Sequence, residues 1–163
     1  MQEQNKVVEY REAVVRLAEE KGWFVFPCKP NKKPFTKNGF KDASSDPEQV
    51  RKWWTQHPNA LVGMPTGGNG LFVLDVDVHK DDGFASLAAL EKTHGALPAG
   101  PYVDTPSSGR HYYFRAPLER IPGCSASKIG PGLDIRGEGG YVIVPPSPGY
   151  VWHNSGLLVP EVF

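Results

Sequence analysis

The sequence has little of what disulfide scaffolds, zinc sites and membrane proteins require. Its two cysteines, Cys28 and Cys124, stand far apart and outside any CxxC pair, so we exclude a disulfide framework and a cysteine-based zinc site. No run approaches the roughly 20 apolar residues that a membrane-spanning helix needs. The N-terminal stretch MQEQNKVVEYREAVVRL has mixed charge and is unlike a signal peptide. We therefore expect a cytoplasmic protein.

The chain also lacks net charge. Its 18 basic residues balance 18 acidic ones, so no overall field attracts it to nucleic acid or to an anionic membrane, and such a partner must be held by a local patch. Repeats, low-complexity tracts and Pro-rich linkers are missing as well. With 163 residues, 39% of them hydrophobic, the chain is long enough for one compact domain with a real core.

Three helices are predicted. Apolar residues at helical spacing indicate a helix over about residues 4–21, closed by Gly22. In SSDPEQVRKWW, Asp46 is an N-cap, Pro47 stands at the first helical position and Gln49 completes a capping box. This helix should end near residues 57–58, and GFASLAALEKTH forms a third helix before the next glycine.

Strands dominate the rest of the chain. The hydrophobic and turn patterns predict strands at residues 23–27, 60–64, 70–78, 101–105, 110–116, 132–136, 141–145 and 149–153. Two pairs of these strands should form hairpins, one with its turn at PSSG and one with its turn at GEGG. Helices mixed with largely antiparallel strands indicate an α+β fold and not a doubly wound one.

An acidic pair follows a hydrophobic run in FVLDVDVHKDD, residues 72–82. On a strand, Asp75 and Asp77 project from the same face while the intervening apolar residues face the core. Two carboxylates so close repel each other unless a cation neutralises them, and oxygen ligands at this spacing suit Mg²⁺ or Mn²⁺. The alternative is a strand that runs into a solvated acidic turn. Calcium is not expected, because the stretch does not have the glycine and glutamate of an EF-hand loop.

A donor-rich turn lies in TPSSGRHYYF, residues 105–114. Ser107, Ser108 and Gly109 form a small turn whose N–H groups could receive an anion, and Arg110 and His111 place two more donors beside it. This turn is a candidate cradle for a nucleoside triphosphate. The alternative is an ordinary hairpin turn followed by a strand.

A third carboxylate lies in GLDIRGEGG, residues 132–140. Asp134 and Arg136 should share one face of a short apolar strand. Asp134 could complete a two-metal site, and Arg136 could meet a phosphate or hold the carboxylates in place. The alternative is a surface ion pair worth less than ~1 kcal/mol.

Two loops carry weaker signals. The segment KPNKKPFTKNGFK, residues 29–41, interleaves five lysines with two phenylalanines, a composition that can grip phosphates and stack on bases. A solvated loop explains it equally well. Lys33 in this loop and Thr66 in the glycine-rich turn MPTGGNG are candidate nucleotide contacts, although the second turn does not have the spacing of a Walker loop.

Taken in order, these stretches resemble one family. In chain order, they are the Lys-Pro loop with GFKDAS, WW with HPNALVGMPTG, the hydrophobic DVD, TPSSGRHYYF, and GLDIRGEGGYVIVPPS with YVW. Together they are similar to the bifunctional primase-polymerase domain of the archaeo-eukaryotic primase superfamily. That family occurs in phage and plasmid replication proteins. The resemblance covers about residues 10 to 155, and the order and spacing of the motifs make it specific.

The resemblance implies a fold and a set of functional residues. The fold would be an RRM-like antiparallel sheet packed with an N-terminal α/β unit around a central catalytic cleft, in a single domain over 1–163 that divides at about residues 1–70 and 71–163. In the family, the DxD pair and a later acidic residue bind two catalytic Mg²⁺ or Mn²⁺ ions, which corresponds here to Asp75, Asp77 and Asp134. A motif of a small residue, any residue and His contacts the nucleotide phosphates and corresponds to Gly109, Arg110 and His111. The family commonly has Ser-Gly-Gly before the His, where this chain has Ser-Ser-Gly.

The implied activity is a template-dependent nucleotidyltransferase that acts on a DNA template-primer with dNTPs or NTPs. His111, Arg110, Ser107 and Arg136 would hold phosphates, and Tyr113 could approach the sugar while its two neighbours pack in the core. A helical primase domain and a helicase commonly follow in the family, so we expect them in the full-length protein, in the cytoplasm of a host cell if a phage encodes it. Two other hypotheses stay open: a non-catalytic single-stranded nucleic-acid-binding module and a metal-dependent nuclease.

Overall fold

The computed structural model describes residues 1–156, 159 and 160. The chain forms two compact units. The first comprises Met1–Pro65 and Tyr141–Pro148, and the second comprises Thr66–Gly140 and Gly149–Phe163. The chain therefore passes from the first unit to the second, returns, and passes to the second again. No helix among the described residues has the length and apolar character needed to cross a bilayer.

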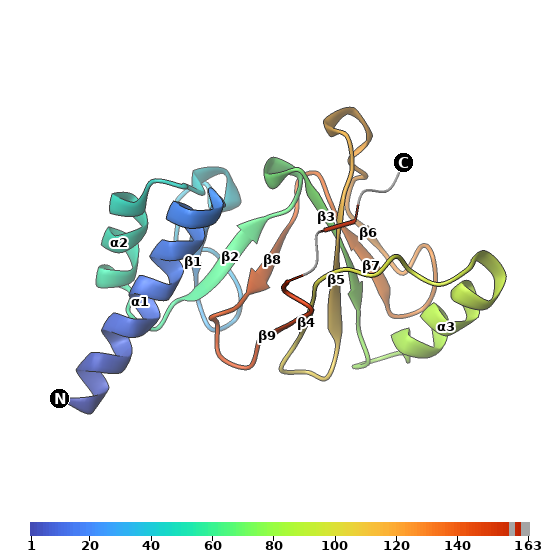
Figure 1. Cartoon of the computed structure of the whole chain (residues 1–163), viewed down its shortest axis with the longest axis horizontal. Coiled ribbons are helices and arrows are strands. Elements are labelled where there is room, and N and C mark those ends of the chain that lie inside the picture. Colours follow the sequence, from blue (N-terminus) through green and yellow to red (C-terminus); the bar gives the residue numbers. More distant parts are fainter. Residues whose placement is uncertain (157–158, 161–163) are drawn as a thin grey trace. The chain divides into compact units, whose positions relative to one another are not determined.

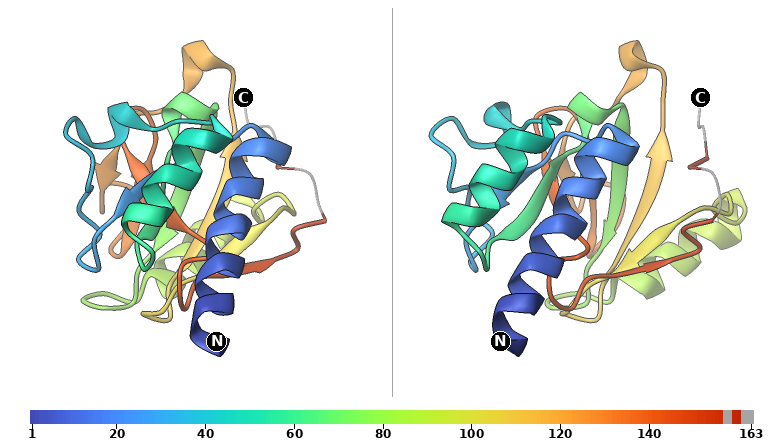
Figure 2. Two further views of the ribbon diagram at one scale, coloured as in Figure 1. Left: turned by 90° about the vertical axis from the view of Figure 1, so that its left-hand side faces the viewer. Right: turned by 60° about the vertical axis from the view of Figure 1, so that its left-hand side comes forward.

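The first unit combines two helices with a small antiparallel sheet. Helices α1 (Gln2–Lys21) and α2 (Pro47–Gln56) lie side by side (Figures 1 and 2). The sheet has the strand order β1-β2-β8, with β1 at Phe26–Cys28, β2 at Leu61–Pro65 and β8 at Tyr141–Val144. A short 3₁₀ turn, η1 (Gly39–Asp42), interrupts the loop after β1. Its core includes the fully buried Val14, Trp54, Phe26 and Met64.

The helix ends follow from local chemistry. Gly22 ends α1 in the left-handed conformation, with φ 65°, and its N–H bonds to the carbonyl of Leu17. Asp46 caps α2 and Pro47 occupies the first turn, as predicted. The carboxylate of Asp46 accepts a hydrogen bond from the N–H of Glu48 at 3.1 Å, so the cap uses this residue and not Gln49.

The second unit is built on a six-stranded antiparallel sheet in the order β6-β7-β3-β5-β4-β9. Its central strands are long and its edge strands short, with these bounds: β3 Leu71–Val76, β4 Tyr102–Asp104, β5 Arg110–Arg115, β6 Ser125–Ala126, β7 Leu133–Arg136 and β9 Val151–His153. A 3₁₀ turn, η2 (Gly67–Asn69), precedes β3. Helix α3 (Gly83–His94) lies between β3 and β4, and a second 3₁₀ turn, η3 (Leu118–Arg120), lies between β5 and β6.

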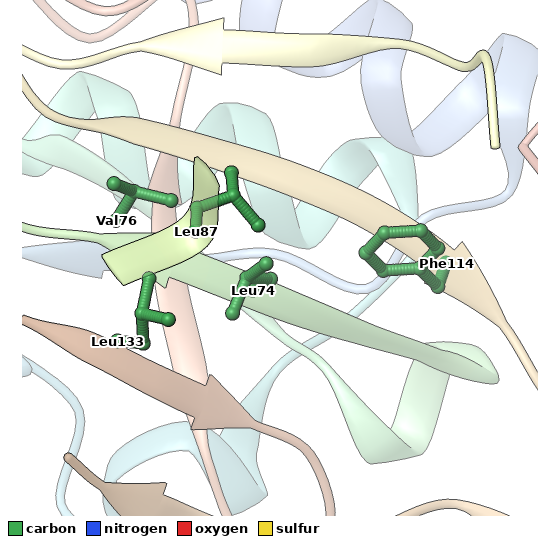
Figure 3. Close-up of a cluster of buried hydrophobic side chains, with 5 residues drawn as sticks. All are labelled: Leu74, Val76, Leu87, Phe114 and Leu133. Atoms are coloured by element: carbon green, nitrogen blue, oxygen red, sulfur yellow. The ribbon is translucent and has the colours of Figure 1, made fainter. Parts of the chain in front are cut away.

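One face of this sheet packs against α3. Figure 3 shows the buried cluster that joins them, formed by Leu74, Val76, Leu87, Phe114 and Leu133. Asp82 caps the helix by accepting a hydrogen bond from the N–H of Ala85 at 3.1 Å. Because side chains alternate along a strand, the residues between these core positions project from the opposite face.

The α+β prediction is confirmed: the described residues form three α-helices and two antiparallel sheets of three and six strands. The hairpin predicted at PSSG is present, since β4 pairs with β5. The prediction of a hairpin at GEGG was wrong. The strand before GEGG, β7, pairs with β3 and β6, whereas the strand after it, β8, pairs with β2 in the other sheet. The first predicted strand also shifts, from residues 23–27 to Phe26–Cys28.

Candidate functional site

The middle of β3 carries a polar cluster. In the antiparallel ladders, Asp75 lies directly opposite Asp134 of β7 and directly opposite His111 of β5. Residues paired in this way project from the same face of a sheet, so three polar side chains from three neighbouring strands stand side by side. Since Leu74 and Val76 face α3, the polar cluster lies on the opposite face of the sheet.

Arg136 supplies positive charge to this cluster. Its Nη2 lies 3.4 Å from Oδ2 of Asp134, and its Nε lies 3.9 Å from Oδ2 of Asp75. Only 23% of each carboxylate side chain is exposed, against 42% of the arginine. An arginine shared by two opposed carboxylates reduces their repulsion. One negative charge is still left uncompensated among these three groups.

His111 is packed beside Asp75 and is almost fully buried. Its Nε2 lies 3.4 Å from Oδ1 of Asp75, and 9% of its side chain is exposed. Its ring centroid is 6.4 Å from that of Tyr150. The other ring nitrogen, Nδ1, is buried and has no hydrogen-bond partner among the described residues. A buried nitrogen of this kind is a candidate contact for a bound polar group.

Tyr113 lies two residues further along β5, on the same face as His111. It is 2% exposed, and its hydroxyl has no hydrogen-bond partner among the described residues. Burial, with the nearby charge of Asp75 as a smaller cause, raises the pKa of Tyr113 above its ordinary value, so the phenol stays protonated. Its neighbours Tyr112 and Phe114 pack with the core cluster beneath α3, as predicted, although Tyr113 is more buried than Tyr112.

Asp134 has a second partner that the sequence does not reveal. Its Oδ1 accepts a hydrogen bond from the backbone N–H of Ser127 at 2.9 Å. Ser127 follows the short edge strand β6 and has a positive φ of 52°. This loop therefore fixes one oxygen of Asp134 and leaves Oδ2 facing Arg136.

Asp77 stands apart from the cluster. It follows the last residue of β3 and is exposed, and its Oδ1 accepts a hydrogen bond from the N–H of His79 at 2.8 Å. This is a turn in which an aspartate caps its own backbone. Among the described residues, no three His, Cys, Asp or Glu side chains form a group placed to hold a metal ion. The structure thus brings Asp75 and Asp134 together but does not show the three-carboxylate arrangement expected from the sequence.

The turn between β4 and β5 is held by Thr105. The carbonyl of Thr105 accepts from the N–H of Ser108 at 3.1 Å, and its Oγ1 accepts from the N–H of Gly109 at 3.1 Å. Two of the N–H groups that we expected to receive phosphate are therefore engaged within the turn. Ser107 is exposed, with its hydroxyl 3.3 Å from Oγ1 of Thr105. A threonine just before a Pro-Ser-Ser-Gly turn is the signal that could have predicted this arrangement.

Arg110 lies on the α3 face of the sheet, away from His111. Its Nε donates to Oδ1 of Asp104 at 2.8 Å, and its guanidinium carbon lies 4.1 Å from the ring centroid of Tyr102 and 5.6 Å from that of Phe84 in α3. Burial by itself lowers the pKa of Arg110, but its hydrogen bonds to Asp104 and Tyr112 outweigh that effect and raise the pKa overall. Arg110 therefore ties the β4–β5 hairpin to α3 instead of facing the carboxylates.

Thr66 also lies outside the cluster. Thr66 is fully buried, and its hydroxyl donates to the carbonyl of Gly137 at 2.6 Å. It fixes the glycine-rich turn after β7, so its hydroxyl is already engaged. Lys33 is an exposed residue of the first unit, in the loop after β1.

The residues present fit a hard divalent cation in part. Mg²⁺ is commonly held in proteins by one or two carboxylates together with substrate phosphates. The directly opposed Asp75 and Asp134 offer that number of ligands, and Arg136 shows that the pair accepts a cation between its oxygens. The N–H of His79 engages only Oδ1 of Asp77, so Oδ2 is the oxygen that Asp77 would offer to a second ion.

The chain was compared with known protein families. Residues 14–161 match the family described as Prim-Pol: bifunctional DNA primase/polymerase, N-terminal. A search of curated proteins found no match. The family match spans most of the chain and includes every residue of the cluster around Asp75.

Proposed function

Because the chain belongs to the bifunctional DNA primase/polymerase family, we propose that it is a template-dependent nucleotidyltransferase that extends or makes primers from dNTPs or NTPs. The observation that supports the proposal best is the pairing of Asp75 with both Asp134 and His111 in the central strands of the larger sheet. Phosphoryl transfer needs groups that position the reactants and neutralise charge more than it needs covalent chemistry. Two opposed carboxylates with an imidazole and a guanidinium beside them are groups of this kind.

Metal binding is part of the proposal. Asp75 and Asp134 would hold Mg²⁺ or Mn²⁺, with Asp77 as a third ligand if two ions bind. When bound, such ions lower the pKa of the primer 3′-hydroxyl and neutralise charge on the triphosphate. In this reaction the bond from the 3′-oxygen to the α-phosphorus would form as the bond to pyrophosphate breaks, and the hydroxyl proton would pass to solvent water.

The protein side chains would orient the triphosphate. Arg136 is the most exposed member of the cluster, with 42% of its side chain accessible, and its planar guanidinium suits phosphate oxygens. His111 would donate from Nδ1 to a phosphate oxygen. Because its Nε2 already faces Asp75 at 3.4 Å, donation from Nδ1 as well requires a ring that carries both protons. The exposed Ser107 would add a hydroxyl at the edge of this site.

A primer-extension assay tests the proposal. A 5′-labelled primer annealed to a longer template is incubated with dNTPs and either Mg²⁺ or Mn²⁺. The wild-type protein should lengthen the primer, and Asp75→Asn should lower the rate by roughly a hundredfold or more, the order expected when one transition-state-stabilising group is lost. Asn keeps the size of the side chain and an oxygen toward His111, so the fold is retained.

Asp81→Asn is the matched control, because Asp81 is an exposed acid of the turn after β3. It should extend primers at the wild-type rate. Extension by Asp75→Asn at the wild-type rate would refute the proposal. Metal-dependent shortening of the primer would identify a nuclease instead, and binding of DNA without either reaction would identify a non-catalytic module.

In this proposal, the two units belong to one catalytic domain. A helical primase domain and a helicase would act with it in a longer polypeptide of a phage or plasmid replication system. Testing initiation separately from extension addresses this point: synthesis on an unprimed template would show that the present chain makes primers without such domains.

A further inference from the structure

The first unit carries a concentration of positive charge that the proposed chemistry does not use. The lysine segment, residues 29–42, contains five of the chain's 18 basic residues: Lys29, Lys32, Lys33, Lys37 and Lys41. All five side chains are exposed. The single acid of the segment is Asp42, whose carboxylate accepts hydrogen bonds from the backbone and side chain of Asn38 at 2.8 and 3.1 Å. In a chain without net charge, this segment is a local site for a polyanion.

The lysine segment is an ordered structure and not a loose loop. The N–H of Lys29 bonds to the carbonyl of Lys33 at 2.8 Å, and the N–H of Lys32 bonds to the carbonyl of Lys29 at 2.8 Å. The carbonyl of Lys32 also accepts a hydrogen bond from the Tyr141 hydroxyl at 2.9 Å, which connects this turn of the lysine segment to β8. Further along, Oγ1 of Thr36 donates to the carbonyl of Gly39 at 2.7 Å. These contacts hold Lys29, Lys32 and Lys33 on one tight turn. Binding of a ligand to this turn therefore costs less conformational entropy than binding to a flexible loop.

An aromatic surface lies next to these lysines. The rings of Phe35 and His57 stack with centroids 4.0 Å apart and an interplanar angle of 15°. Phe35 is 38% exposed, so part of its ring is accessible to solvent. Nζ of Lys29 lies 5.7 Å from the centroid of the Phe35 ring. A base that stacks on this pair would therefore have an ammonium group within reach of its backbone phosphate.

We infer that the lysine segment and the Phe35–His57 stack form a binding surface for single-stranded DNA. The lysines contact phosphates, and the stacked rings receive a base, which only an unpaired strand can offer. The inference rests on the proposed function solely for the choice of DNA as the polyanion. It assigns Lys33 to the DNA backbone and not to the incoming nucleotide.

Salt-dependent binding tests the phosphate contacts. Fluorescence anisotropy measures the affinity for a labelled 20-nucleotide oligothymidylate at several KCl concentrations, with EDTA present so that metal binding plays no part. Each lysine–phosphate contact on a single strand contributes about 0.7 to the slope of log K against log salt. The double variant K32Q/K33Q should reduce that slope by about 1.4. The control K6Q/K92Q removes the same charge from two exposed lysines elsewhere and should leave the slope unchanged.

Substitution of the ring tests the stacking contact. Phe35→Leu keeps an apolar side chain but removes the aromatic face, and it should weaken binding of the oligothymidylate by about 5- to 150-fold, the range for loss of one stacked base. The salt slope should not change, because no charge is lost. A duplex of equal length should bind to wild type and to Phe35→Leu with the same affinity.

The outcomes separate this inference from the proposed function. Unchanged slope and affinity in K32Q/K33Q and Phe35→Leu would overturn the inference, whatever the primer-extension assay shows. Equally tight binding of duplex and single strand, both sensitive to Phe35→Leu, would also overturn it. A protein that binds single strands through these residues but does not extend primers would uphold the inference and refute the polymerase proposal.

Discussion

Asp75 and Asp134 face each other across the ladder between β3 and β7, and the guanidinium of Arg136 lies within 3.9 Å of one carboxylate and 3.4 Å of the other. In the free protein, this arginine partly compensates a pair of like charges. The same arrangement defines where a divalent cation would find two ligands.

A metal-binding prediction follows from this pair. A ligand that binds only the folded protein stabilises it, by about 2.7 kcal/mol at a hundred times its dissociation constant. Mn²⁺ should therefore raise the melting temperature of the wild-type protein, and Asp134→Asn should abolish the increase while retaining the hydrogen bond from Ser127. Calorimetry with and without Mn²⁺ measures the difference. An equal Mn²⁺-dependent increase in Asp134→Asn would show that this carboxylate is not a ligand.

The turn before His111 gives a stability prediction. Ser108 has φ 66°, a left-handed conformation that costs a non-glycine residue roughly 1–2 kcal/mol. Ser108→Gly, which restores the Ser-Gly-Gly sequence common in the family, should stabilise the protein by about 0.5–1 kcal/mol after the added chain entropy of glycine is subtracted. Urea denaturation measures it.

Ser107→Gly is the matched control for this turn, because Ser107 has no positive φ and glycine there only adds entropy to the unfolded chain. It should be neutral or slightly destabilising. A loss of stability in Ser108→Gly would mean that the serine hydroxyl contributes more than the backbone conformation costs.

The buried hydroxyl of Tyr113 leads to a third prediction. A buried polar group without a partner costs about 1–3 kcal/mol, and the Tyr113 hydroxyl has no partner among the described residues. Tyr113→Phe should therefore raise the free energy of unfolding by about 1 kcal/mol. Tyr112→Phe should lower it, because that hydroxyl accepts from Nη1 of Arg110 at 3.3 Å. If Tyr113→Phe instead destabilises the protein or impairs nucleotide use, the hydroxyl has a functional partner.

Acid stability should depend on Glu12, which lies 3.2 Å from both Arg11 and Arg51. Its hydrogen bond from Arg51 is the main cause that lowers the pKa of Glu12 below its ordinary value of 4.5. Because the folded-state pKa is depressed, the stabilisation is complete above pH 4.5 and disappears as the pH falls through the lowered pKa. Because the Glu12–Arg51 ion pair is solvent-exposed, an interaction of this kind contributes less than ~1 kcal/mol to the free energy of unfolding.

Glu12→Gln should therefore destabilise the protein slightly at neutral pH, and by less at an acidic pH below the lowered pKa of Glu12, where the carboxyl group is protonated in both states. Urea midpoints at the two pH values give the comparison. Glu9→Gln, at an exposed position on the same helix, should show no such difference. A Glu12→Gln variant with the same deficit at both pH values would exclude the charge as the cause.

Much of the fold could be predicted from local patterns. The alternation around Leu74 and Val76 predicted a strand with one apolar face, and the structure buries those residues under α3. Caps such as Asp46 and Gly22 mark helix ends because their chemistry is local. The pairing partners of strands are not local. β7 and β8 flank a glycine-rich turn typical of a hairpin, yet tertiary contacts place them in different sheets.

The candidate site was predictable where it depended on strand alternation. Period-2 spacing correctly placed Asp134 and Arg136 on one face. The same spacing puts Arg110 and His111 on opposite faces, a consequence that the motif resemblance obscured. For Asp77, the alternative of a strand that runs into a solvated acidic turn matches the structure. β3 ends one residue earlier, and the carboxylate accepts a hydrogen bond from the N–H of His79.

The return of β8 to the first unit has a consequence for protein synthesis. The strand order β1-β2-β8 requires Tyr141–Val144 to pair with β2, although some 75 residues separate them. During translation, β2 leaves the ribosome with one edge bare and must wait for nearly the whole second unit to emerge. Until then, that bare edge is open to pairing with other nascent chains.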